Sequence, residues 1–104
     1  AGYSAAKAAV INFSRAVASE GAAHNIRCNV VIPGVVDTPA TAGMLSDAKT
    51  RRNTEKVIPM QRVGLPVELA NVILFLASDE ASYVTGASLA VDGGRSSDLY
   101  TVLE

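Results

Sequence analysis

The sequence lacks tryptophan, contains a single cysteine and has no long hydrophobic run. One cysteine, Cys28, excludes an internal disulfide framework and a cysteine-rich zinc site, so we expect no metal. The longest purely apolar run, residues 72–77, is far shorter than the ~20 residues of a membrane-spanning helix. Nine Lys and Arg oppose ten Asp and Glu, a formal net charge of -1. These absences argue against nucleic-acid and membrane partners and indicate a reducing, cytoplasmic compartment.

The composition that remains is typical of one folded domain. The chain has 104 residues, of which 49% are hydrophobic and 18% are charged. This length suits one small domain and is too short for two. The apolar fraction is high enough to bury a core, so the chain is not compositionally disordered.

Residues 4–23 are rich in alanine and contain no proline, and their only glycine is Gly21, which predicts a helix. Three apolar residues interrupt its polar arc, namely Ala8, Ile11 and Ala18, so we expect a second, partly buried side. The broad face expected to pack on the core consists of Ala5, Ala6, Ala9, Val10, Phe13, Ala16 and Val17.

Two segments are predicted to be buried strands. Residues 27–32 end in a β-branched run that stops at Pro33 and Gly34, and residues 87–91 form the second run. With a helix between them, the two strands form a parallel crossover unit. Because parallel sheets lie between layers of helices in larger α/β folds, we expect the tail of a doubly wound domain. A small stand-alone domain is the alternative.

The helix between these strands is expected to begin at Pro66, with Glu68 near the positive end of its dipole. Another short helix is predicted over residues 46–56, inside a mobile segment. The Pro66 helix carries two apolar stripes, one for the core (Leu69, Val72, Ile73, Leu76) and one opposite it (Ala70, Leu74, Ala77).

Tyr3 and Lys7 are spaced i, i+4 at the start of the first predicted helix, so they share one face. An ammonium beside a phenol favours the phenolate, and the positive helix N-terminus acts in the same direction. Such a tyrosine could exchange a proton with a carbonyl or an alcohol. By itself the spacing is also compatible with an amphipathic tyrosine beside a lysine that extends into solvent.

Residues 3–9, Tyr-Ser-Ala-Ala-Lys-Ala-Ala, resemble the Tyr-x-x-x-Lys signature of the short-chain dehydrogenase/reductase family. Further segments resemble that family in its order and spacing from Tyr3 to Gly94, namely residues 25–34, 35–38, 62–66, 75–78, 83–86 and 89–94. The resemblance implies an α/β fold, specifically the C-terminal part of a Rossmann-type doubly wound parallel sheet, with residues 1–104 as one portion of a single domain.

The resemblance also implies roles for individual residues. Tyr3 would be the catalytic acid/base, and Lys7 would assist it and bind the ribose hydroxyls of the nicotinamide cofactor. Four residues after the first strand would line the nicotinamide pocket, namely Pro33, Gly34, Val36 and Thr38. Val36 would offer backbone groups to the carboxamide, and Thr38 would offer its hydroxyl or amide to the carboxamide or a phosphate.

Residues 39–61 correspond to the substrate lid of the family, with candidate contacts at Ala40, Thr41, Met44 and Leu45. Met44 and Leu45 are either lid contacts or core residues. The family's glycine-rich dinucleotide turn and its catalytic serine have no counterpart in the sequence. We therefore expect this chain alone to lack a complete active site.

The resemblance implies an enzyme that uses NAD or NADP and transfers a hydride to or from a small alcohol or carbonyl compound, such as a secondary alcohol, a ketone or a 3-oxoacyl thioester. It also implies a homo-oligomer, a tetramer or a dimer, which the second apolar stripes favour independently. Two alternatives stay open. One is an extended relative such as a nucleotide-sugar epimerase, and the other is a non-catalytic oligomerisation or binding module with the same fold.

Other polar residues favour structural interpretations. His24 is expected to interact with a helix C-terminus, and Cys28 to be a small core residue. Lys49, Arg51 and Arg52 could attract an anionic substrate such as an acyl-carrier thioester, but the pattern favours a solvated helix face.

Overall fold

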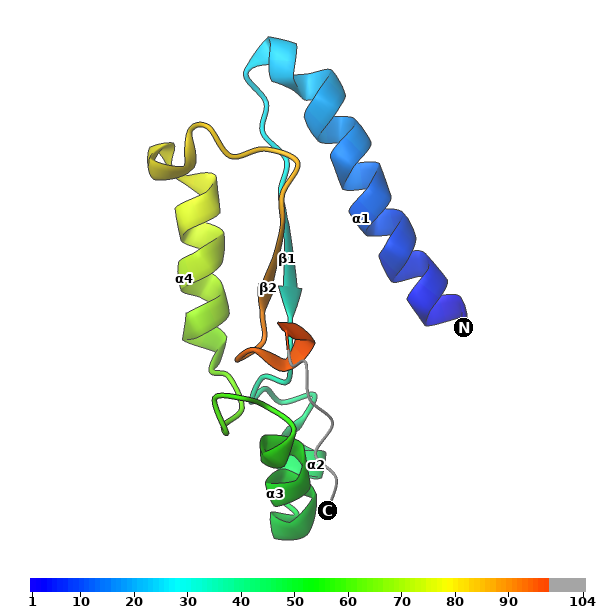
Figure 1. The fold of residues 1–104 in the computed structure, drawn as a ribbon, viewed down its shortest axis with the longest axis vertical. Helices are drawn as coiled ribbons and strands as arrows, with labels where there is room; N and C mark the ends of the chain where they lie inside the picture. The colour runs from blue at the N-terminus through cyan, green and yellow to red at the C-terminus, as the bar shows by residue number, and fades with distance from the viewer. Residues whose placement is uncertain (98–104) are drawn as a thin grey trace. The chain divides into compact units, whose positions relative to one another are not determined.

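The structure is a computed structural model that describes residues 1–97, and Figure 1 shows the order of its elements. The helices and strands are α1 (Gly2–Gly21), the 3-10 turn η1 (Ala22–His24), β1 (Val30–Pro33), α2 (Ala42–Leu45), α3 (Ala48–Lys56), α4 (Pro66–Ala77), η2 (Asp79–Ala81), β2 (Ser88–Val91) and η3 (Arg95–Ser97). None of the helices in this part of the chain is long and apolar enough to cross a membrane.

The strands β1 and β2 pair in one sheet, as Figure 1 shows. The Val30 N–H donates to the Ala87 carbonyl at 2.8 Å, and the Gly34 N–H donates to the Val91 carbonyl at 3.0 Å. Both partners advance in the same direction along the chain, so the strands are parallel. Helix α4 lies between them in sequence, which confirms the predicted strand–helix–strand unit.

The strand β1 begins later than predicted, at Val30 rather than at residue 27. Before that point one backbone bond, from the Gly86 N–H to the Cys28 carbonyl at 2.8 Å, is supplemented by side-chain bonds. The Cys28 N–H donates to the Thr85 hydroxyl, and the Asn29 amide donates to the Val84 carbonyl and accepts from the Ala87 N–H. These bonds align the two segments without regular strand pairing.

The described part of the chain divides into two compact units, residues 1–31 with 73–89, and residues 32–72 with 90–97. In the first unit, Ala18 and Ala81 are buried. The Arg27 guanidinium donates to the carbonyls of Leu76, Ser78 and Val84, at 2.7, 3.1 and 3.2 Å. Arg27 thereby satisfies carbonyl groups at and beyond the C-terminal end of α4.

The expected core face of α1 is exposed in this chain, so that prediction is wrong here. Val10 and Phe13 are exposed, the latter 71%, and the buried residue of the helix is Ala18, which was placed on the other side. A neighbour covers only this end of the helix. A Cβ added at Gly86 would contact the Ala18 Cβ at 3.6 Å. Periodicity identified an apolar face, but burial requires a packing partner.

The second unit has a small core of Leu45, Ile58 and Val63, each 3–4% exposed, with Val35 packed against it. The predicted short helix is α3, whose N-cap Asp47 accepts the Thr50 N–H. The four-residue helix α2 before it was not predicted. This core supports the segment that follows β1, where the predicted cofactor residues lie.

Candidate functional site

Tyr3 and Lys7 lie one turn apart near the start of α1, as their spacing predicts. The Lys7 Nζ stands 5.3 Å from the centroid of the Tyr3 ring, a cation–π geometry. The Tyr3 side chain is 76% exposed. The pair therefore presents an open phenol with a cation held over its ring, within the first unit.

Pro33 and Gly34 end β1, as predicted, and belong to the second unit. The Gly34 N–H donates to the Val91 carbonyl, and a Cβ on Gly34 would lie only 2.7 Å from the Asp92 Cβ. Glycine is therefore required here by the close approach of Asp92. This structural reason was not predicted, and it stands beside the predicted role at the nicotinamide.

Val36 forms a parallel bridge with Gly64. The Gly64 N–H donates to the Val35 carbonyl and the Asp37 N–H donates to the Gly64 carbonyl, both at 2.9 Å. Because backbone groups alternate along an extended chain, the N–H and C=O of Val36 itself point to the opposite edge. The predicted contact between the Val36 backbone and a carboxamide would therefore be made on the edge away from Gly64.

Thr41, predicted as a lid residue, stabilises the turn that follows. Its hydroxyl donates to the Val36 carbonyl at 2.6 Å and accepts the Thr38 N–H at 3.0 Å. The Thr38 amide is therefore engaged inside the protein. The other Thr38 group predicted to meet a ligand is its hydroxyl. It lies 3.4 Å from the Thr41 hydroxyl.

The remaining lid candidates differ in burial. Ala40 and Met44 are exposed, whereas Leu45 belongs to the core cluster of the second unit. Among the basic residues of α3, Arg51 pairs with Glu55 at 3.0 Å and lies 4.0 Å from Asp37. An attraction for anions at this helix is therefore partly neutralised by its own carboxylates.

Arg62 and Glu68 form an ion pair that sequence reasoning did not predict. The two guanidinium nitrogens of Arg62 donate to the two carboxylate oxygens of Glu68, at 2.7 and 2.8 Å, and the Leu65 N–H donates to Glu68 at 3.0 Å. These hydrogen bonds, first the one from Arg62, lower the pKa of Glu68 from its ordinary 4.5 to about 2. Pro66 and Glu68 predicted the start of a helix, but no sequence pattern predicted Arg62 as the partner of Glu68.

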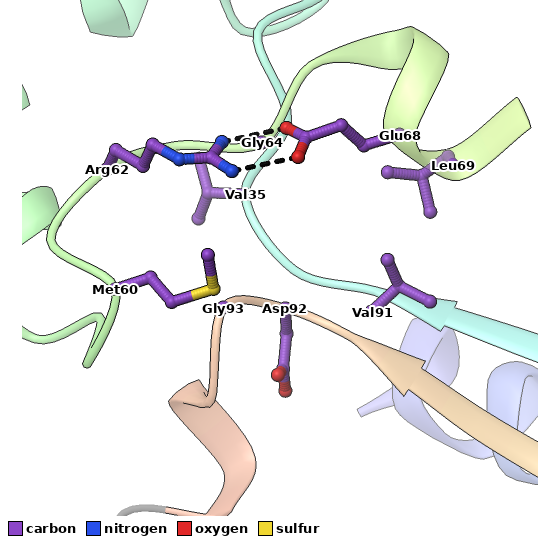
Figure 2. Close-up of a pocket in the computed structure, with 9 residues that line it drawn as sticks. All are labelled: Val35, Met60, Arg62, Gly64, Glu68, Leu69, Val91, Asp92 and Gly93. Carbon is purple, nitrogen blue, oxygen red and sulfur yellow. Dashed lines mark hydrogen bonds and ion pairs between the residues drawn. The ribbon is translucent and has the colours of Figure 1, made fainter. Parts of the chain in front are cut away.

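A cavity of about 110 Å³ lies beside this pair (Figure 2). Figure 2 shows Arg62 and Glu68 facing one another, while the Asp92 carboxylate points away from them. The lining residues are Val35, Met60, Arg62, Gly64, Glu68, Leu69, Val91, Asp92 and Gly93. Its volume is below the ~300 Å³ at which small-molecule sites begin, so the cavity is not a cofactor site by itself.

Asp92 ends β2 and organises the turn that follows. Its carboxylate accepts the N–H groups of Gly94 and Ser96, both at 3.0 Å, and hydrogen bonds from Ser96 are the main reason that its pKa is lowered. Within residues 1–97, no group of three His, Cys, Asp or Glu side chains is arranged to hold a metal ion. His24 is the last residue of η1, and Cys28 is half-buried.

A parallel strand–helix–strand unit is the building block of α/β folds, among them the Rossmann-type fold. Comparison with known proteins extends this assignment. The family model described as enoyl-(acyl carrier protein) reductase matches residues 1–96. The chain belongs to the short-chain dehydrogenase/reductase family, as its motifs predicted.

Two relatives illustrate the similarity in sequence. The 3-oxoacyl-[acyl-carrier-protein] reductase FabG of Chlamydia muridarum is 47% identical over 92 residues, which are 88% of this chain and 36% of that protein. The cis-4-hydroxycyclohexanecarboxylate dehydrogenase of Sinomonas cyclohexanicum is 50% identical over 92 residues, with the same two shares. The chain thus spans 36% of the length of each relative.

Solved structures are similar over the same region. A 4-hydroxyisoleucine dehydrogenase in complex with NADH superposes with a TM-score of 0.89 at 31% identity, over 92% of this chain and 40% of that one. A protein from Agrobacterium tumefaciens with bound NADP gives a TM-score of 0.87 at 36% identity, over 92% and 39% of the two chains. These matches confirm the predicted Rossmann-type fold.

Proposed function

We propose that this chain is part of an NAD(P)-dependent oxidoreductase that transfers a hydride between a nicotinamide cofactor and an alcohol or carbonyl substrate. The observation that carries the proposal is the Tyr3–Lys7 pair, held one turn apart at the start of α1. Support comes from the relatives, which bear the names of reductases and dehydrogenases, and from two similar structures that hold NADH and NADP.

In this proposal Tyr3 exchanges a proton with the substrate oxygen. Its phenol gives the proton when a carbonyl is reduced and takes it back when an alcohol is oxidised. Lys7 contributes a positive charge that stabilises the phenolate formed, and it binds the ribose hydroxyls of the cofactor. The N-terminus of α1 adds partial positive charge in the same place.

The polar groups after β1 fit a nicotinamide carboxamide, which has one acceptor oxygen and two N–H donors. On the edge away from Gly64, Val36 offers its N–H and the second lone pair of its C=O, which already accepts the Thr41 hydroxyl at 2.6 Å. Thr38 offers its hydroxyl. We assign the Thr38 contact to the hydroxyl because Thr41 already engages the Thr38 amide. Pro33 and Gly34 would line the same pocket. When bound, the nicotinamide supplies or accepts the hydride.

Exposure distinguishes among the proposed lid residues within 39–61. We propose that Ala40 and Met44, which are exposed, contact the substrate, whereas Leu45 and Thr41 hold the lid to the rest of the second unit. The substrate class is a secondary alcohol, a ketone or a 3-oxoacyl thioester, in line with the 3-oxoacyl-[acyl-carrier-protein] reductases among the relatives.

We also propose that the whole enzyme is a homo-oligomer, a tetramer or a dimer. Leu74 in the second stripe of α4 is 69% exposed, and Phe75 is exposed as well. Ile73, which was expected in the core stripe, is exposed too. An apolar helix surface of this kind is typically covered in the assembled protein. The alternative is that another part of the same polypeptide covers this surface of α4.

The test of the proposed activity is Tyr3→Phe in the full-length protein, with Tyr83→Phe as the matched control. Tyr83 is fully exposed, so removing its hydroxyl should leave turnover unchanged. Tyr3→Phe should reduce kcat by about 100-fold or more while cofactor binding persists, and Lys7→Ala should impair both. Turnover by Tyr3→Phe equal to that of the control would contradict the assignment and would favour a non-catalytic module.

A further inference from the structure

We propose that the Arg62–Glu68 ion pair is a positioning device for the backbone at Val36–Thr38, and that it sets the affinity for the nicotinamide end of the cofactor. The inference rests on the proposed function, because it concerns the segment assigned there to the carboxamide. Neither Arg62 nor Glu68 contacts the cofactor in this proposal.

The pair fixes the segment that precedes α4 at several points. Arg62 binds both carboxylate oxygens of Glu68 in a bidentate manner, and it also donates to the Val63 carbonyl at 3.2 Å. Glu68 in turn accepts the Leu65 N–H at 3.0 Å. Since Glu68 is in the first turn of α4, these bonds tie residues 62–65 to a rigid helix.

Gly64 lies in the middle of the tied segment and is the residue that pairs with Val36. Its N–H and C=O bond the Val35 carbonyl and the Asp37 N–H, both at 2.9 Å. Steric fit does not fix this register, because a Cβ on Gly64 would meet its neighbours at an ordinary 3.6–3.7 Å. The register therefore depends on hydrogen bonds and on how firmly residues 62–65 are held.

The connection continues to the ligand-facing groups. The bridge orients the N–H and C=O of Val36, and the Thr41 hydroxyl links the Val36 carbonyl to the Thr38 amide. All of these residues belong to the second unit, so the path from Glu68 to Thr38 lies within one compact body. A displacement of Gly64 would therefore shift the N–H and C=O of Val36 directly, and Thr38 only through Thr41.

A purely stabilising role explains the pair less well. Both side chains are partly solvated, 47% and 38% exposed, and ion pairs in such positions contribute little to stability. What the pair supplies is geometry, because a bidentate Arg–carboxylate contact fixes orientation as well as distance. The low pKa of Glu68, about 2, keeps the carboxylate charged at any physiological pH.

The test compares Glu68→Gln with Glu80→Gln in the full-length protein. Glu68→Gln keeps an acceptor for the Leu65 N–H and removes the ion pair, whereas Glu80 is exposed and makes no ion pair with any residue in 1–97. Two ligands are titrated against each variant. One is the reduced dinucleotide, and the other is ADP-ribose or its 2′-phosphate, which lacks the nicotinamide.

The expected result is that Glu68→Gln weakens dinucleotide binding about five- to tenfold, within the range of effects from residues outside a site, and leaves ADP-ribose binding unchanged. The KM for the cofactor should rise by a similar factor, while kcat changes little. Arg62→Lys keeps the charge and loses the bidentate geometry, so its dinucleotide affinity should lie between those of wild type and Glu68→Gln. If Glu68→Gln does not fold, Arg62→Lys is tested in its place.

Equal losses for both ligands, or no loss for either, would overturn the positioning role and leave the proposed function intact. Failure of the unmodified protein to bind either ligand would instead contradict the proposed function, and the positioning role with it. Glu80→Gln should match wild type in every titration.

Discussion

Gly34 and Asp92 approach each other so closely that no side chain fits at position 34. A Cβ on Gly34 would lie 2.7 Å from the Asp92 Cβ and 2.8 Å from its Cα. The Asp92 Cα belongs to the backbone, so a larger residue at position 34 cannot be accommodated by a side-chain rotation alone. The glycine that ends β1 is thus fixed by packing before any ligand is considered.

Replacing Gly34 with alanine is therefore expected to destabilise the protein by about 1–3 kcal/mol, as overpacking does. Gly43 in α2 is the matched control, because a Cβ there meets nothing within 4 Å. Gly43→Ala should be neutral or stabilising by up to ~1 kcal/mol, since alanine favours helix. Urea denaturation of the two variants measures the difference. Equal stability would contradict the close approach.

Thr41→Val should loosen the turn that presents Thr38. It removes the hydroxyl that donates to the Val36 carbonyl and accepts the Thr38 N–H, and leaving such groups unpaired costs about 1–3 kcal/mol. Thr41→Ser keeps the hydroxyl and should lose much less. Denaturation midpoints and dinucleotide titrations are measured for both. If valine and serine behaved alike, the hydroxyl would have no such role.

Acid stability should depend on Glu68 to a small extent, because solvent screens this partly exposed ion pair. Its pKa is lowered from 4.5 to about 2 in the folded protein, chiefly by the Arg62 hydrogen bonds. A folded-state pKa below the unfolded value means that the contribution is complete above pH 4.5 and is lost as the pH falls toward 2. Glu68→Gln should therefore flatten the pH dependence of the denaturation midpoint in this window, and Glu80→Gln should not. A slope unchanged by Glu68→Gln would contradict the assigned pKa.

The oligomer proposal is tested by Ile11→Glu combined with Leu74→Glu. If symmetry-related copies cover these helices, sedimentation should show a folded species smaller than that of the unmodified protein. Loss of folding would show instead that the stripes pack inside the same polypeptide. A clean monomer in light scattering of the unmodified protein would refute the proposal without any variant.

Several features followed from local sequence because their causes are local. Alanine content and the absence of proline placed α1, and Pro66 with Glu68 placed the start of α4. Residues spaced i, i+4 are neighbours on any helix, and Tyr3 and Lys7 are neighbours in the structure. Order and spacing of motifs sufficed to identify the family, which the comparisons confirm.

Other features could not be read from sequence because they depend on irregular backbone paths that no periodic pattern describes. The Arg62–Glu68 pair requires a particular path through residues 61–65, which begins with Gln61 at a left-handed φ of 59°. The Thr41 hydroxyl meets the Val36 carbonyl across a turn directly before α2, a helix that was not predicted. Periodicity likewise marked the apolar face of α1 without deciding that Ala18 is its buried residue.

The sequence by itself determined the three longer helices and the parallel strand order, since propensity, capping and periodic spacing act over a few residues. The resemblance of its motifs added the family and the acid/base candidates. Tertiary structure alone decided which faces are buried, why position 34 must be glycine and which groups hold Val36 and Thr38. Those properties depend on contacts between segments far apart in the chain, as at Gly34 and Asp92, or on irregular turns, as at Thr41, so no periodic pattern encodes them.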